Sequence, residues 1–177
     1  MIFKRLARIL ATATLLVTSA AAQTIEPGVW QHHQATLLYS GLTALYTCDG
    51  LEDKVRSLLL YLGARDDLKV HAFGCSSLDR PSRFASVSAD FYSLVAADAG
   101  AAQTVPGQWV TLTLGPRRPD WMDDGECELV DQIKGLLTKS FSMRNLQYRT
   151  SCMPHQVTIA DYNVRGQILK PVGKSSR

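Results

Sequence analysis

The stretch Leu51-Glu-Asp-Lys-Val-Arg-Ser-Leu-Leu59 decides the fold, together with its counterpart Leu129-Val-Asp-Gln-Ile-Lys-Gly-Leu-Leu137. In both stretches apolar residues stand at positions i, i+4, i+7 and i+8, which places them on one face of an α-helix. Each stretch therefore predicts an amphipathic helix with one buried face. The similarity also indicates that the chain contains the same structural unit twice.

The cysteines frame these two stretches at similar spacing. Cys75 follows Cys48 by 27 positions, and Cys152 follows Cys127 by 25. If each helix connects two strands by a right-handed crossover, the strand ends that carry the cysteines lie at one edge of the sheet. Four cysteines allow three pairings. The repeat predicts the pairs Cys48–Cys75 and Cys127–Cys152.

Segments with strand-like apolar patterns surround the helices. They are 43–48, 68–73, 83–95, 107–114, 144–152 and 156–169, with an additional N-terminal strand at 29–39. The predicted fold class is α+β, with two pseudo-repeated β-α-β-β units, possible halves 40–95 and 107–169. These units form a mostly antiparallel sheet with two helices packed on one face.

The helix ends carry capping residues. Asp49 followed by Glu52 resembles a capping box, and Asp124 stands where it could cap the second helix. Gly63 is expected to end the first helix.

Residues 1–22 have the pattern of a secretory signal peptide. Lys4, Arg5 and Arg8 precede an apolar run, and Ser19-Ala-Ala-Ala22 ends in small residues. The run is shorter than the roughly 20 residues of a membrane anchor, which is the alternative. We expect cleavage before Gln23, one disulfide-linked α+β domain over residues 23–177, and no stable membrane insertion afterwards. A periplasmic or secreted location follows, where paired cysteines are the rule.

The charge balance changes when the signal is removed. The signal takes three of the 19 basic residues and none of the 16 acidic ones, so the remaining chain carries 16 of each and no net charge. Nucleic acid is therefore not an expected partner.

No cofactor or metal site is expected. His32 and His33 are neighbours in a strand-like run and should point to opposite faces, and His71 lies on the side of its strand opposite Val70. Cys152-Met-Pro-His155 resembles a redox motif, but a strand and not a helix follows it, so a structural disulfide is favoured.

The segment 115–126 is a possible contact loop. It combines charged residues with one tryptophan: Arg117, Arg118, Trp121, Asp123 and Asp124. An exposed tryptophan among charges is typical of a contact hot spot. The alternative, which we favour, is that Trp121 folds back over the core while the carboxylates cap the second helix, because long loops commonly bury their own aromatic residue.

No coherent catalytic set is visible. The leading hypothesis is an exported, non-enzymatic binding or assembly module, with another envelope or secreted protein as its partner. The rival is a small envelope hydrolase whose residues assemble only in three dimensions, with Asp123, Asp124, His71 and His155 as the first candidates. An enzyme should gather titratable side chains in a pocket, whereas a binding module should expose an apolar patch. A structural envelope protein without a small ligand is the third possibility.

Overall fold

The computed structural model describes residues 24–75, 80–153 and 161–173. Its elements follow in the order β1 (Ile25–Ser40), α1 (Cys48–Tyr61), β2 (Lys69–Phe73), β3 (Phe84–Ala96), β4 (Val105–Leu114), α2 (Cys127–Ser140), β5 (Met143–Thr150) and β6 (Tyr162–Pro171). The predicted α+β class and the two predicted helices are confirmed. The signal-peptide prediction lies outside the described residues.

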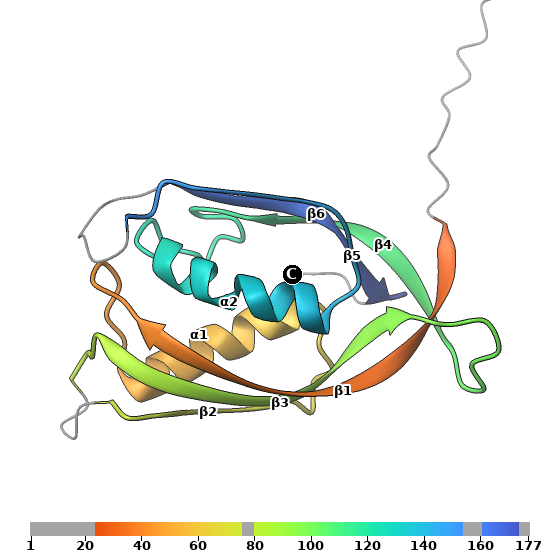
Figure 1. The fold of residues 1–177 in the computed structure, drawn as a ribbon, viewed down its shortest axis with the longest axis horizontal. Coiled ribbons are helices and arrows are strands. Elements are labelled where there is room, and N and C mark those ends of the chain that lie inside the picture. Colours follow the sequence, from red (N-terminus) through yellow and green to blue (C-terminus); the bar gives the residue numbers. More distant parts are fainter. Residues whose placement is uncertain (1–23, 76–79, 154–160, 174–177) are drawn as a thin grey trace, which may run out of the picture.

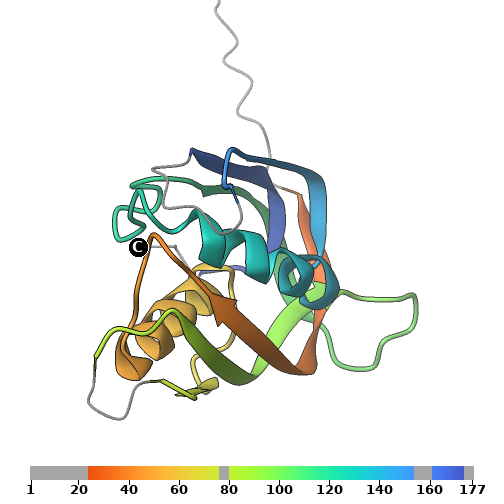
Figure 2. The same cartoon turned by 60° about the vertical axis from the view of Figure 1, so that its left-hand side comes forward.

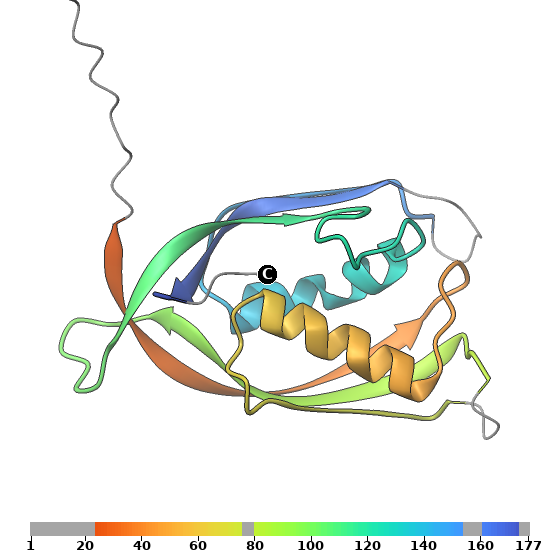
Figure 3. The same cartoon turned by 180° about the vertical axis from the view of Figure 1, so that it is seen from behind.

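All six strands form one antiparallel sheet in the order β2-β3-β1-β4-β6-β5. The sheet is strongly bent, and both helices lie inside the bend (Figures 1 and 3). We call residues 24–96 the first half and residues 105–171 the second half. Figure 2 shows the strands of one half facing those of the other across the helices, with the 97–104 connection protruding from the body.

The seam between the halves is narrow. β1 pairs with β3 from Gly28 to Ser40, but it pairs with β4 only from Ile25 to Gly28. The remaining contact between the halves is made by side chains, which are described below.

The core consists of the predicted apolar faces. In β3, alternate residues are buried (Ala85, Val87, Ala89 and Phe91), and the helices bury Leu51, Val55, Leu58 and Leu59 from α1 and Leu129, Ile133 and Leu137 from α2. The spacing in the sequence therefore placed these side chains on the correct faces.

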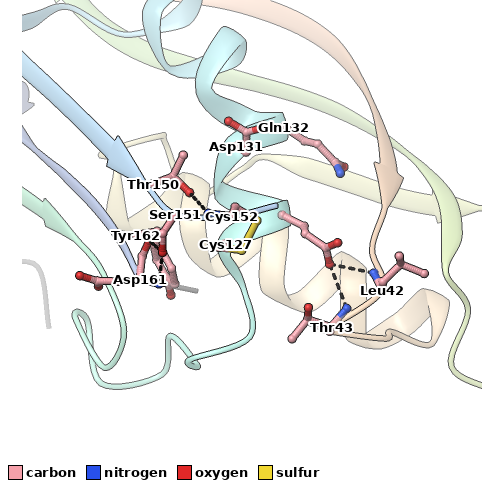
Figure 4. Close-up of a disulfide and its surroundings, with 12 residues drawn as sticks. Leu42, Thr43, Cys127, Asp131, Gln132, Thr150, Ser151, Cys152, Asp161 and Tyr162 are labelled. Carbon is pink, nitrogen blue, oxygen red and sulfur yellow. Dashed lines mark hydrogen bonds between the residues drawn. A yellow bond between two sulfur atoms is a disulfide. The ribbon is translucent and has the colours of Figure 1, made fainter. Parts of the chain in front are cut away.

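The prediction of a strand at 43–48 is wrong. This segment forms bends, and within it only Tyr46 makes an isolated bridge. The N–H groups of Leu42 and Thr43 donate to Glu128 Oε2, at 2.8 and 3.0 Å, and not to a neighbouring strand (Figure 4). The strand that precedes α1 is therefore β1, which the sequence predicted only as an additional strand.

Two capping predictions are also wrong. Thr47, not Asp49, is the N-cap of α1, and its hydroxyl accepts from Gly50 N at 3.1 Å. Glu52 instead accepts the N–H of Ala72 in β2 at 3.3 Å. For α2, the N-cap is Glu126 without a side-chain capping bond, and Asp124 pairs with Arg117.

Gly63 ends α1 as predicted. Its φ of 97° lies in the left-handed region, and an added Cβ would lie 3.0 Å from the side chain of Lys170. Both the conformation and the close approach require glycine here.

The last carbonyl of each helix accepts a hydrogen bond from a side chain of the other half. Lys170 Nζ in β6 donates to Tyr61 O, the last carbonyl of α1, at 2.5 Å, and Ser93 Oγ in β3 donates to Ser140 O, the last carbonyl of α2. Burial lowers the pKa of the Lys170 ammonium. These two bonds connect the halves near the β1–β4 seam, because Lys170 pairs in register with Gln108, which itself pairs with Ile25.

Both predicted disulfides are present. Cys48–Cys75 and Cys127–Cys152 have Cα–Cα distances of 5.7 and 5.8 Å. The prediction that Cys48 and Cys127 end strands is wrong, because they are the first residues of α1 and α2. Each bond therefore fastens the start of a helix to the end of the strand that follows it (Figure 4 shows the second).

Candidate functional site

The predicted contact loop folds back onto α1. The Trp121 ring is half-buried and packs edge-on against Tyr61, with centroids 6.1 Å apart, and Lys54 Nζ lies 5.5 Å from the centre of the indole ring. Lys54 also donates to Trp121 O at 2.7 Å. This is the alternative favoured from the sequence for the tryptophan, although the carboxylates do not cap α2.

Of the charged residues predicted for the contact loop, three are in ion pairs, and Arg118 is exposed. Arg117 and Asp124 pair at 3.1 Å on the surface, and Asp123 lies 3.6 Å from Lys54. Arg118 is exposed. A role of Arg117 and Arg118 in contacting a partner stays a prediction.

A buried ionic cluster that the sequence did not reveal lies under this loop. Glu126 is 1% exposed, and its Oε1 accepts from Lys54 Nζ at 2.6 Å and from the Tyr46 hydroxyl at 2.7 Å. Its Oε2 accepts from Asp123 N at 3.0 Å. Burial, followed by the charge of Glu126, raises the pKa of Tyr46, so its hydroxyl stays a donor. Because both carboxylate oxygens are engaged, this cluster is a structural bridge between the halves.

The candidate hydrolase residues that the structure describes, His71, Asp123 and Asp124, do not form one site. His71 is exposed on β2, stacks on Phe73 and lies 3.6 Å from Glu52, whereas Asp123 and Asp124 lie beside Lys54 and Arg117 in the loop. His155 lies outside the described residues. Within the described ranges, no group of three or more His, Cys, Asp or Glu side chains could hold a metal ion.

The adjacent histidines have separate partners. His32 Nε2 contacts Asp90 at 2.9 Å on the exposed side of the sheet, and His33 Nε2 contacts Ser93 Oγ at 3.0 Å. The single proton of the Ser93 hydroxyl is donated to Ser140 O, so His33 Nε2 must carry the proton that it shares with Ser93. Ser93 is fully buried. A serine that is buried and accepts from histidine is not an activated nucleophile.

A groove lies between the two helices, over β1 and β3. Its volume is about 480 Å³. Of its thirteen lining residues, seven are apolar or glycine and six are polar: Ala35, Leu37, Val55, Val87, Ala89, Gly135 and Leu136, and His33, Gln34, Thr36, Gln132, Lys139 and Ser140. A hollow that combines apolar surface with polar groups is suited to a small molecule.

Two features of the groove concern binding. No carboxylate lines it, and the Lys139 ammonium has no partner among the described residues. Gly135 stands inside α2, where an added Cβ would meet nothing within 4 Å. A glycine inside a helix costs up to about 1 kcal/mol relative to alanine, and no packing contact explains it here. The groove is therefore our candidate functional site.

A second surface is an exposed apolar patch on the opposite face of the first half. Leu38, Phe73 and Phe84 are 72%, 46% and 65% exposed. Leu38 and Phe73 both pair with Ser86 in register, and Phe84 precedes Ser86 by two residues on the same face. The three side chains are therefore neighbours across β1, β2 and β3.

Comparisons with known proteins give no further information on this site. No protein-family model matches the chain, and neither the search of curated proteins nor that of solved structures found a match. Among the described residues, no helix has the length and apolar character needed to cross a membrane.

Proposed function

We propose that the protein is an exported, non-catalytic binding module whose groove holds a small anionic amphiphile. The observation that carries the proposal is the groove itself: its floor of Ala35, Val87 and Ala89 is apolar, no carboxylate is in its lining, and Lys139 at the rim has no partner among the described residues. The apolar body of the ligand would lie over Ala35, Val87 and Ala89, and its acidic end near Lys139. Burial of the apolar part supplies affinity, and the ammonium fixes orientation.

The hydrolase is the less supported alternative. The groove contains one histidine, His33, and its Nε2 proton is shared with Ser93. No acid stands in the lining to act with it. General acid–base catalysis needs such groups within hydrogen-bond reach of each other and of the substrate.

Export is part of the proposal. Two disulfides favour an oxidising compartment. The N-terminal pattern of residues 1–22 favours delivery there by a signal peptide. A mass corresponding to a chain from Gln23, four hydrogens below the fully reduced value, would support both parts.

Gly135 offers a direct test. Gly135→Leu should fill the groove without a backbone clash, whereas Gly135→Ala makes the helix equally regular and leaves the groove open. The probe is 1-anilinonaphthalene-8-sulfonate, an anionic aromatic amphiphile, and dodecanoate is the competitor. We expect the wild type and G135A to bind the probe alike, and G135L to bind it about ten-fold more weakly or worse.

The control for this test is the exposed patch, which could bind the same probe. Leu38→Ser should leave probe binding unchanged if the groove is the site. Equal binding by G135L and G135A, or loss of binding in L38S, would contradict the proposal. Near-ultraviolet circular dichroism establishes that each variant is folded.

A second candidate function is docking of another exported protein on the patch of Leu38, Phe73 and Phe84. Three large apolar side chains exposed together are a common mark of protein contacts. A photo-crosslinking residue at Phe84 should yield a discrete adduct in the cell envelope, and one at Thr111, exposed on β4, should not. Identical adduct patterns at both positions would argue against docking.

The internal repeat also belongs among the proposals. The elements read β-α-β-β twice, and the strand order is the same from each sheet edge to the centre. Each helix also begins with a disulfide cysteine. These features support a duplicated unit with residues 24–96 and 105–171 as its copies.

A further inference from the structure

A second hollow lies at one end of β5 and β6, apart from the groove. Its volume is about 460 Å³, and seven residues line it: Gln147, Arg149, Thr150, Ser151, Asp161, Asn163 and Arg165. Every one of them is polar. The core residues Tyr162 and Val164 alternate with Asn163 and Arg165 along β6, so the hollow is on the face away from the helices.

The two arginines of this hollow lie close together, and no ion pair to either is found among the described residues. Arg149 pairs in register with Asn163, and Gln147 pairs with Arg165. The two arginines are therefore diagonal neighbours on adjacent strands, with Cα atoms about 7 to 8 Å apart. Neither guanidinium bonds to a side chain among the described residues. By contrast, Arg144 in β5 binds Glu26 at 2.9 Å and stacks on Trp109.

Thr150 and Ser151 hydrogen-bond the backbone at one side of the hollow. Thr150 Oγ1 accepts from Cys152 N at 2.9 Å, and Ser151 Oγ donates to Asp161 O at 3.1 Å. Figure 4 shows Thr150, Ser151 and Asp161 beside the Cys127–Cys152 disulfide, which fixes this end of the strands. The site is therefore built on a cross-linked scaffold.

The side chains of Gln147, Asn163 and Asp161 have no partner among the described residues. Two amides and a carboxylate can accept hydrogen bonds from hydroxyl groups, and the amides can also donate. A carboxylate beside the arginines disfavours a polyanion but suits a ligand that has both hydroxyl groups and one acidic group.

We propose that this hollow binds an anionic sugar, a ring with several hydroxyl groups and one carboxylate or phosphate. The two guanidinium groups bind the acidic group, for which their planar donor geometry is suited. Asp161, Asn163 and Gln147 bind the hydroxyl groups. This inference is independent of the function proposed for the groove.

The test uses four probes and the isotope-labelled full chain. Glucuronate carries a carboxylate and glucose 6-phosphate a phosphate, so these two probes distinguish the acidic groups. Glucose has no acidic group, and inorganic phosphate has no sugar hydroxyl groups. We expect at least one of the two acidic sugars to shift the amide signals of Gln147 and Asn163 and to bind about ten-fold more tightly than glucose or phosphate. Binding of phosphate as tight as that of both sugars would show an adventitious ion only and would overturn the proposal.

Variants locate the site. R149Q combined with R165Q should weaken binding of the acidic sugar about ten-fold or more, and D161N, which removes the negative charge beside the arginines, should strengthen phosphate binding relative to sugar binding. Arg117→Gln removes a distant exposed arginine and serves as the control. Unchanged sugar affinity in R149Q/R165Q would overturn the proposal. Since all four substitutions are at exposed side chains, the remaining amide signals will report an intact fold.

Discussion

The two halves protect their sheet edges in different ways. In the first half, α1 covers the edge strand β2: Glu52 accepts the N–H of Ala72, and Arg56 donates to Leu68 O at 3.0 Å. In the second half, the hydrogen bond between α2 and the edge strand β5 among the described residues joins two side chains: Tyr148 donates to Asp131 at 2.7 Å. No described residue of α2 hydrogen-bonds the β5 backbone. The first edge is therefore closed by its helix.

The second edge relies on other means. β5 has a register irregularity between Arg144 and Gln147, and Asn145 has a φ of 53°. Arg144 and Arg149 add charge along the strand. Bulges and charges of this kind discourage another strand from pairing with an open edge. The comparison shows that one arrangement of elements can satisfy the same requirement by hydrogen bonds or by irregularity.

Breaking the ionic bridge between the halves should have the largest effect. Glu126→Ala leaves Lys54 and the Tyr46 hydroxyl without their buried partner, so we expect a loss of about 3 to 5 kcal/mol in the free energy of unfolding. Asp124→Ala removes an exposed pair with Arg117 and should cost less than about 1 kcal/mol. Urea unfolding measures both. Similar losses in the two variants would mean that the bridge does not join the halves energetically.

The disulfides give the second largest effect, and they compare the halves directly. The two bonds close loops of 27 and 25 residues. Chain entropy therefore predicts nearly equal stabilisation, roughly 3 kcal/mol each. Replacing one pair of cysteines at a time by alanine and measuring thermal unfolding tests this. A difference above about 1 kcal/mol would have to come from native packing, since Cys127 is fully buried.

Opening the edge of β2 should have a smaller effect. Glu52→Ala together with Arg56→Ala leaves the N–H of Ala72 and the carbonyl of Leu68 without their side-chain partners, at a cost of about 1 kcal/mol for each bond. Hydrogen exchange at the Ala72 amide should become faster. Asp131→Ala with Lys134→Ala, the matched change in α2, should leave the exchange of the β5 amides nearly unchanged. If β5 responds as strongly as β2, the proposed difference between the edges is wrong.

The smallest effect concerns pH. Burial, followed by the neighbouring charge of His32, lowers the pKa of His33 below its ordinary value of 6.5. The unfolded chain therefore binds the proton more readily, so the stability contributed by neutral His33 is complete above pH 6.5 and decreases as the pH falls toward the folded-state pKa. His33→Gln should reduce this decrease. Melting temperatures at pH 5 and pH 7.5 for both proteins test it; identical pH dependence would rule out His33 as its source.

The sequence predicted the elements in which the residues that make the stabilising contacts recur at regular spacing along the chain. The two helices, the alternation in β3 and both disulfides follow from spacings within about thirty residues. Segment 43–48 was misassigned because the N–H of Thr43 donates to Glu128, which is 85 positions away. Such a distant side-chain bond leaves no local pattern. The same holds for Lys54 and Glu126.

The candidate groove was missed for a similar reason. Its floor comes from β1 and β3, and its sides from two helices that are far apart in the chain. One signal was available: Gly135 stands where the first helical stretch has Ser57, and glycine is a poor helix residue. Only the three-dimensional arrangement shows that this position faces open space.

The bond between Lys170 and the end of α1 has a consequence for the order of folding. Its two residues are 109 positions apart, so the first half can form neither this bond nor the Glu126 bridge until the second half has been synthesised. Contacts of such long range slow folding. The carbonyl end of α1, the first helix to be made, therefore waits for its partner from β6, the last strand to be made.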